Sequence, residues 1–123
     1  MAKILIVEDQ VLIVELIEMV LQHRGHQTHH TGDGGRAVEL ARSIRPDLIL
    51  LDLLLPNMDG YVIQSKLLEH DETRAIPLIV VTSKSHTQEI FRMSTNVAAF
   101  IAKPFGVNEL IQKVDDCLKK SRA

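Results

Sequence analysis

Five polar residues each stand at or just after the end of a short apolar run, where a buried strand would stop. They are Glu8, Asp9, Asp52, Thr82 and Lys103. The carboxyl ends of parallel strands meet at one edge of a sheet, so we expect these side chains to lie close together. Three carboxylates, one hydroxyl and one ammonium would then share a single site.

Such a site suits the chemistry of a metal ion and a phosphoryl group. Carboxylates placed together repel one another unless a cation lies among them, and an all-oxygen set with room for water is typical of Mg²⁺. Lys103 would hold a phosphoryl oxygen by its charge, and Thr82 would donate a hydrogen bond from a neutral group. Asp52 would then act as the nucleophile toward phosphorus.

Each motif alone has a simpler explanation. The pair Glu8-Asp9 is common at helix N-termini, Lys103-Pro104 is usually a turn, and Asp59-Gly60 indicates turn chemistry without a catalytic part. Histidines between residues 23 and 30 suggest a transition-metal site, but an exposed helix end and a polar edge strand explain them better, because no acid or cysteine completes the set. The order of five polar groups at successive strand ends carries the prediction.

The chain alternates apolar runs with segments of helical periodicity. Strands are expected at Ile4–Val7, His26–Thr31, Leu48–Leu51, Leu78–Val81 and Ala99–Ala102, the second from its context alone. Helices are expected at Val11–Arg24, Ala37–Ile44 and Tyr61–Glu69, within His86–Thr95, and at Val107–Leu118. Strict alternation predicts an α/β fold, in which five helices cover an open, doubly wound sheet of five parallel strands.

Length and composition fit one domain over residues 1–123. Of the 123 residues, 46% are hydrophobic, which is enough for a core without disulfides. The net charge of -2 is spread along the chain, so nothing predicts direct binding of nucleic acid. Cys117 falls in an apolar helical pattern and is expected to be a buried thiol in a reducing cytoplasm. No segment has the pattern of a signal peptide or a membrane span.

The residues at the strand ends resemble those of the receiver domain of two-component response regulators. The resemblance is carried by Glu8-Asp9, by the segment from Asp52 to Gly60, by Thr82 and by Lys103-Pro104-Phe105, in this order and spacing. The resemblance covers residues 3 to 119. The chain is similar in particular to single-domain receivers of the chemotaxis-regulator type. The resemblance implies a flavodoxin-like fold with strand order 2-1-3-4-5.

The resemblance implies a metal site and a phosphoacceptor. Asp52 would be the phosphoacceptor, and Mg²⁺ would be held by Asp9, by Asp52 and by the backbone carbonyl of Leu54. Glu8 would act through metal-bound water. Lys103 would bind the phosphoryl group, and the peptide bond between Lys103 and Pro104 would be cis, a form rare enough to need a reason.

The resemblance also implies a switch and two kinds of partner. Thr82 would bind the phosphoryl group and act with Phe100, which occupies the aromatic switch position of the family. Phosphate would come from a sensor histidine kinase or a histidine phosphotransfer protein. A downstream protein would read the change on the surface made by the fourth helix, the fifth strand and the fifth helix. The domain would be no enzyme beyond catalysing its own phosphorylation and dephosphorylation.

Three other functions compete with this interpretation. A haloacid-dehalogenase-type hydrolase needs a second acid two residues after the nucleophile, where this chain has Leu54. A flavodoxin-like nucleotide binder needs a glycine-rich loop after the first strand, where this chain has Glu8-Asp9. A receiver-like interaction module that works without phosphorylation remains the alternative.

Overall fold

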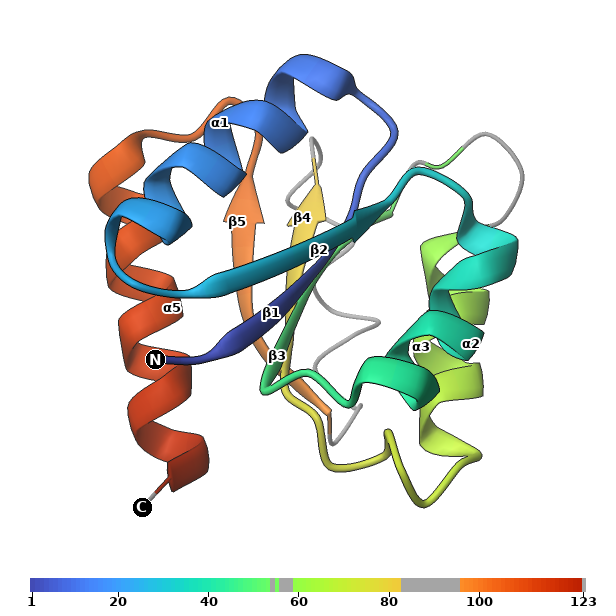
Figure 1. Cartoon of the computed structure of the whole chain (residues 1–123). Coiled ribbons are helices and arrows are strands. Elements are labelled where there is room, and N and C mark those ends of the chain that lie inside the picture. Colours follow the sequence, from blue (N-terminus) through green and yellow to red (C-terminus); the bar gives the residue numbers. More distant parts are fainter. Residues whose placement is uncertain (54, 56–58, 83–95, 123) are drawn as a thin grey trace.

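The computed structural model describes residues 1–53, 55, 59–82 and 96–122, and it shows a layered α/β fold (Figure 1). The described elements are β1 (Lys3–Val7), α1 (Val11–His23), β2 (Gln27–Thr31), α2 (Gly34–Ile44), β3 (Leu48–Asp52), α3 (Gly60–Leu68), β4 (Leu78–Thr82), β5 (Val97–Ala102) and α5 (Val107–Arg122). The helix expected within residues 86–95 lies outside the described residues. The other predicted elements are confirmed, with small shifts at their ends.

All five described strands form one parallel sheet in the order β2-β1-β3-β4-β5. Helices α1 and α5 cover one face of the sheet, and α2 and α3 cover the other (Figure 1). This is the doubly wound, flavodoxin-like arrangement that the sequence predicts. It aligns the carboxyl ends of β1, β3, β4 and β5 along one edge, where folds of this kind bind their ligands.

The central strands β1 and β3 are buried on both faces of the sheet. Every residue in Ile4–Val7 and in Leu48–Leu51 is apolar, as a strand covered by helices on both sides requires. Neighbouring residues point to opposite faces, so Ile6 joins the core beneath α1 and α5, whereas Leu5 joins the core beneath α2 and α3. These two cores hold the strand ends of the site in place.

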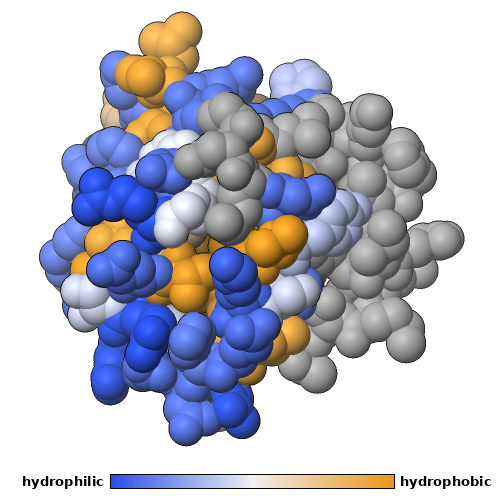
Figure 2. Space-filling view, turned by 90° about the vertical axis from the view of Figure 1, so that its right-hand side faces the viewer, coloured by the Kyte–Doolittle hydropathy of each residue, from blue (hydrophilic) through white to orange (hydrophobic). Residues whose placement is uncertain are grey.

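Two Asp-Gly pairs begin helices. The carboxylate of Asp33 accepts a hydrogen bond from the backbone N–H of Gly35 at 2.9 Å, and that of Asp59 accepts one from Tyr61 at 2.8 Å. Each aspartate is therefore the N-cap of its helix, α2 or α3. The sequence predicts turn chemistry without a catalytic part for Asp59-Gly60, and in the structure Asp59 also caps α3. The outer surface of these helices is mainly hydrophilic (Figure 2), as expected when the apolar side of each helix is buried.

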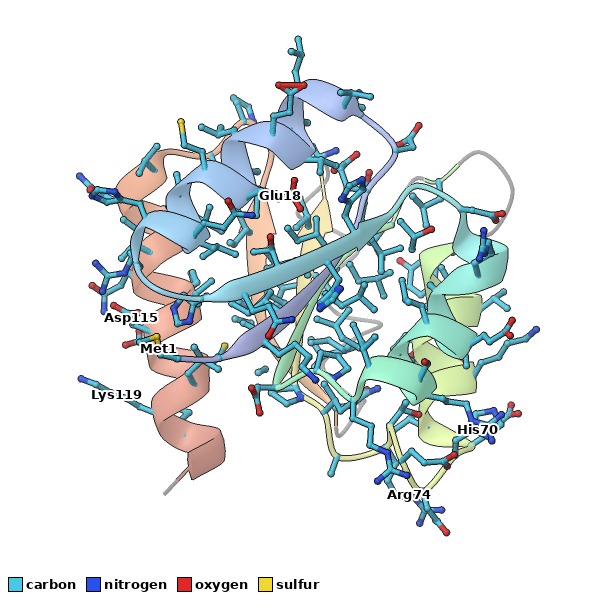
Figure 3. All side chains as sticks on the ribbon, in the orientation of Figure 1. Met1, Glu18, His70, Arg74, Asp115 and Lys119 are labelled. Atoms are coloured by element: carbon cyan, nitrogen blue, oxygen red, sulfur yellow. The ribbon has the colours of Figure 1, made fainter. Side chains whose placement is uncertain are left out.

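β2 is a polar strand at the edge of the sheet, and side chains of α1 hold it. Glu18 of α1, which is labelled in Figure 3, accepts a hydrogen bond from the hydroxyl of Thr28 at 3.2 Å and lies 3.2 Å from Nδ1 of His30. His26 accepts a hydrogen bond from the backbone N–H of Ala2 at 3.1 Å. These histidines therefore have separate local partners. The contacts of Glu18 with Thr28 and His30 explain how β2, whose residues have weak strand propensity, pairs with β1.

Cys117 is buried in the core beneath α1 and α5, as predicted. Burial raises the pKa of its thiol above the ordinary value of 9.0, so the thiol stays protonated and unreactive at neutral pH. Among the described helices, none combines the length and the apolar composition needed to cross a bilayer.

Gly60 lies where α3 starts against the end of β3, and the contact leaves no room for a side chain. A Cβ at this position would lie 2.7 Å from the Cα of Leu53 and 3.1 Å from the backbone oxygen of Asp52. Replacing Gly60 with alanine is therefore expected to lower the free energy of unfolding by about 1–3 kcal/mol, measured by urea denaturation. Gly106→Ala is the control, because a Cβ there would meet nothing within 4 Å. Equal stabilities of the two variants would contradict the prediction.

Candidate functional site

Strand ends bring the predicted polar residues to one edge of the sheet. Glu8 and Asp9 directly follow β1, and the N–H of Glu8 donates to the carbonyl of Thr31 at 3.0 Å, which extends the pairing with β2. Asp52 is the last residue of β3, and Lys103 directly follows β5. The local backbone at each position is thus fixed by the sheet, and the side chains are presented beyond it.

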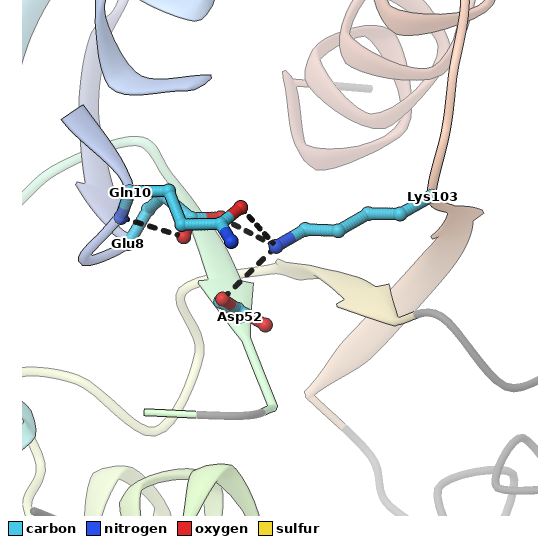
Figure 4. A network of polar contacts seen from close by, with 4 residues as sticks. All are labelled: Glu8, Gln10, Asp52 and Lys103. Carbon is cyan, nitrogen blue, oxygen red and sulfur yellow. Dashed lines mark hydrogen bonds and ion pairs between the residues drawn. The ribbon is translucent and has the colours of Figure 1, made fainter. Parts of the chain in front are cut away.

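The ammonium of Lys103 bridges two carboxylates from different strands. Its Nζ lies 3.0 Å from Oε1 of Glu8 and 3.1 Å from Oδ2 of Asp52 (Figure 4). Glu8 and Asp52 are each only 3% exposed, and the Lys103 side chain is 20% exposed. Charges this far from water interact more strongly than a surface pair does, and loss of the ammonium would remove a positive charge from beside both carboxylates.

Burial and charge shift the protonation of this group. Burial raises the pKa of Glu8 above 4.5, and the hydrogen bonds from the Gln10 backbone and from Lys103 do not cancel this effect. Burial alone would lower the pKa of Lys103, but its hydrogen bonds and Coulomb attraction to Glu8 and Asp52 raise it above 10.5. The ammonium is therefore charged at neutral pH, beside a Glu8 carboxylate whose charge is disfavoured by burial.

The three carboxylates suit a hard divalent cation. One oxygen each from Glu8, Asp9 and Asp52 lie within 4.8 Å of one another. Asp9 is exposed, so the group opens toward solvent and leaves room for water or for an oxygen of a substrate. Oxygen donors with open positions are what Mg²⁺ prefers. The residues present therefore fit the metal that the sequence predicts.

Two expected site residues are described only in part or not at all. Thr82 ends β4, but its side chain lies outside the described residues, as does the whole of Leu54. Phe100 is half-buried in β5 and belongs to a small apolar cluster with Leu53 and Val80. The assignments of Thr82, Leu54 and Phe100 thus stay predictions.

One residue near the site was missed by the sequence interpretation. The side-chain oxygen of Gln10 lies 3.5 Å from Nζ of Lys103, and the Gln10 backbone N–H donates to Oε2 of Glu8 at 3.1 Å (Figure 4). The signal was a glutamine at the N-cap of α1, where serine, threonine, aspartate or asparagine is favoured. The peptide bond between Lys103 and Pro104 is cis, as the resemblance implies.

Ionised Glu8 is expected to reduce the stability of the metal-free protein at neutral pH. Because its pKa is raised by folding, its contribution to stability is complete below pH 4.5 and is lost as the pH rises through the raised pKa. Glu8→Gln should therefore be more stable than wild type at neutral pH in the presence of a chelator. This advantage should shrink as the pH falls toward 4.5.

Urea denaturation of both proteins across this pH range measures the difference. Glu39→Gln, at an exposed position within α2, is the control for the same chemical change away from the site. An advantage of Glu8→Gln that grows on acidification would contradict the prediction.

Comparison with known proteins gives a consistent picture. The family model of the response regulator receiver domain matches residues 4–115. PilH of Pseudomonas aeruginosa is 32% identical over 119 residues, which cover 96% of this chain and 98% of PilH. The DNA-binding response regulator MtrA of Mycobacterium leprae is 33% identical over 97% of this chain but only 52% of its own length. The chain thus spans about half the length of such relatives.

Solved structures with the same fold include two receiver domains of histidine kinases. That of a Syntrophus aciditrophicus kinase is 35% identical, with a TM-score of 0.85 and coverage of 98% of this chain and 92% of that one. That of PA1611 from Pseudomonas aeruginosa is 29% identical, with a TM-score of 0.86 and coverage of 96% and 98%, and it holds a magnesium ion in its active-site cleft. From the strand order, the family match and these relatives, we conclude that the chain belongs to the response regulator receiver domain family.

Proposed function

We propose that residues 1–123 act as one receiver domain in which Asp52 accepts a phosphoryl group from a histidine kinase or a histidine phosphotransfer protein. One observation carries this proposal: Lys103 forms ion pairs with Glu8 and Asp52 at the carboxyl edge of the sheet, and Asp9 lies beside them. It joins a buried nucleophile, a cation for the transferred group and a set of metal ligands. The buried thiol of Cys117 fits a reducing compartment such as the cytoplasm.

The reaction is a transfer of phosphorus from nitrogen to oxygen. A carboxylate oxygen of Asp52 attacks the phosphorus of a phosphohistidine, forming a P–O bond as the P–N bond breaks. The leaving imidazole nitrogen keeps the electron pair and takes up a proton from water. Lys103, now 3.1 Å from Oδ2 of Asp52, would move its contact to a phosphoryl oxygen and neutralise charge there.

Asp9 and Asp52, with the carbonyl of Leu54, would hold Mg²⁺, and Glu8 would act through a metal-bound water. When bound, the metal supplies positive charge that stabilises the phosphoryl oxygens and relieves repulsion among the carboxylates. The ion in the active-site cleft of the PA1611 receiver domain supports this part of the proposal. So does the donor chemistry, because each of the three side chains offers a carboxylate oxygen.

Signalling would follow from a rearrangement between Thr82 and Phe100. The Thr82 hydroxyl would move toward the new phosphoryl group, and the half-buried Phe100 ring, which carries no hydroxyl, would turn into the vacated space. A protein partner would read the altered surface of β5, α5 and the segment that connects β4 to β5. Packed interiors tend to have discrete arrangements, so one new hydrogen bond can bias a neighbouring ring between two of them.

Intact mass after incubation with acetyl phosphate tests this function without a known partner. The protein should gain one phosphoryl group in the presence of Mg²⁺ and none in the presence of a chelator. NMR signals of Phe100 should shift in the phosphorylated sample. A protein that gains no phosphoryl group under either condition would be a phosphorylation-independent interaction module, and an unmoved Phe100 signal in a phosphorylated protein would contradict the switch alone.

A further inference from the structure

Gln10 contacts both ends of the ion pair between Glu8 and Lys103. Its backbone N–H donates to Oε2 of Glu8 at 3.1 Å, while its side-chain oxygen lies 3.5 Å from Nζ of Lys103 (Figure 4). The ammonium has three protons, and among the described residues three oxygen acceptors lie around it, from Glu8, Asp52 and Gln10. Of these three acceptors, the oxygen of Gln10 is the one that carries no charge.

Glutamine is an unfavourable residue at this position of the helix. Gln10 is the N-cap of α1, and its side chain makes no capping hydrogen bond. A serine, threonine, aspartate or asparagine at this position would cap the helix and stabilise it. A residue that breaks a local rule beside a functional site often does so because the site needs it.

We propose that Gln10 is a positioning residue for Lys103, an inference that rests on the proposed function. Asp52 must release its bond to Lys103 when its oxygen attacks phosphorus, and the contact with Glu8 alone would draw the ammonium toward that carboxylate. The amide oxygen of Gln10 holds the third proton of the ammonium near the solvent-facing side of the site, where the incoming phosphoryl group arrives. Gln10 itself needs no contact with phosphorus.

Two substitutions separate this role from a structural one. Gln10→Met keeps the length of the side chain and removes the acceptor. Gln10→Ser also removes the contact with Lys103, but it introduces a favoured N-cap, so this variant should melt at a higher temperature than wild type. Both variants should be phosphorylated by acetyl phosphate about three- to tenfold more slowly at saturating Mg²⁺, as expected for the loss of one long hydrogen bond to a charged donor.

A direct readout of the contact is the exchange of the Lys103 ammonium protons with water, followed by NMR on ¹⁵N-labelled protein. Exchange should be faster in both Gln10 variants than in wild type. Gln22→Met is the control, because it removes a 2.7 Å hydrogen bond to Thr28 near the opposite end of the same helix from Gln10. It should leave both the phosphorylation rate and the Lys103 exchange unchanged.

If Gln10→Ser is phosphorylated more slowly than wild type but melts at a higher temperature, the result supports the role of Gln10. A residue with a purely structural role would change the phosphorylation rate and the melting temperature in the same direction. Wild-type phosphorylation rates and wild-type Lys103 exchange in both variants would overturn it. If the wild-type protein itself gains no phosphoryl group, the proposed function fails. If the wild type is phosphorylated and both Gln10 variants are phosphorylated at the same rate, the role of Gln10 is wrong but the proposed function stands.

Discussion

Asp52→Asn is expected to abolish phosphorylation while leaving the fold intact. The amide of asparagine is a poor nucleophile, so the mass of the variant should stay unchanged after incubation with acetyl phosphate and Mg²⁺. The fold should tolerate the change because asparagine has almost the same shape and still offers Lys103 an oxygen acceptor. The variant also has one fewer carboxylate beside Glu8 and Asp9, so its free energy of unfolding should lie within about 1 kcal/mol of wild type or above it.

The matched control is Asp116→Asn, which makes the same chemical change at an exposed position of α5. Asp116 accepts a hydrogen bond from Gln112 of the same helix. This variant should gain one phosphoryl group, as wild type does. If Asp52→Asn is phosphorylated at the wild-type rate, Asp52 is not the acceptor, and the proposed function fails at its centre.

The strands could be predicted from the sequence because burial on both faces leaves a simple signal. Runs such as Leu48–Leu51 have no polar residue for either face, and their ends are marked by acids. β2 had no such signal: its residues are polar, and it could be placed only because an alternating fold needs a strand there. What stabilises it is long-range, namely pairing with β1 and the contacts of Glu18 with Thr28 and His30.

The sequence was sufficient to predict which residues form the site, but not which of their side chains contact one another. Topology alone places Glu8, Asp9, Asp52 and Lys103 at one edge, so their order along the chain was sufficient. That Lys103 would bind Glu8 as closely as Asp52 depends on side-chain conformations that no spacing encodes. The same holds for Gln10, whose side chain leaves the helix end and turns toward Lys103.

Lys103→Met is expected to change phosphorylation and metal binding in opposite directions. Lys103 supplies the charge next to Asp52, so its loss should slow phosphorylation by about 10²- to 10³-fold, the range found when an enzyme loses one electrostatic contact to a transition state. The same ammonium competes with a metal for the oxygens of Glu8 and Asp52, which lie 3.0 and 3.1 Å from it. Mg²⁺ should therefore bind the variant about tenfold more tightly, since a charge at this range is worth more than about 1 kcal/mol.

Stability gives a third measurement on the same variant. Without Lys103, the buried carboxylates of Glu8 and Asp52 lose the ammonium that lies 3.0 and 3.1 Å from them, so the metal-free variant should lose about 2–4 kcal/mol of its free energy of unfolding. Saturating Mg²⁺ should restore part of this loss, because the metal binds only the folded arrangement. Calorimetric titration and urea denaturation with and without Mg²⁺ measure both effects, and Lys120→Met, at an exposed position of α5, is the control. Weaker Mg²⁺ binding in Lys103→Met would show that the ammonium helps to hold the metal site together and does not compete for it.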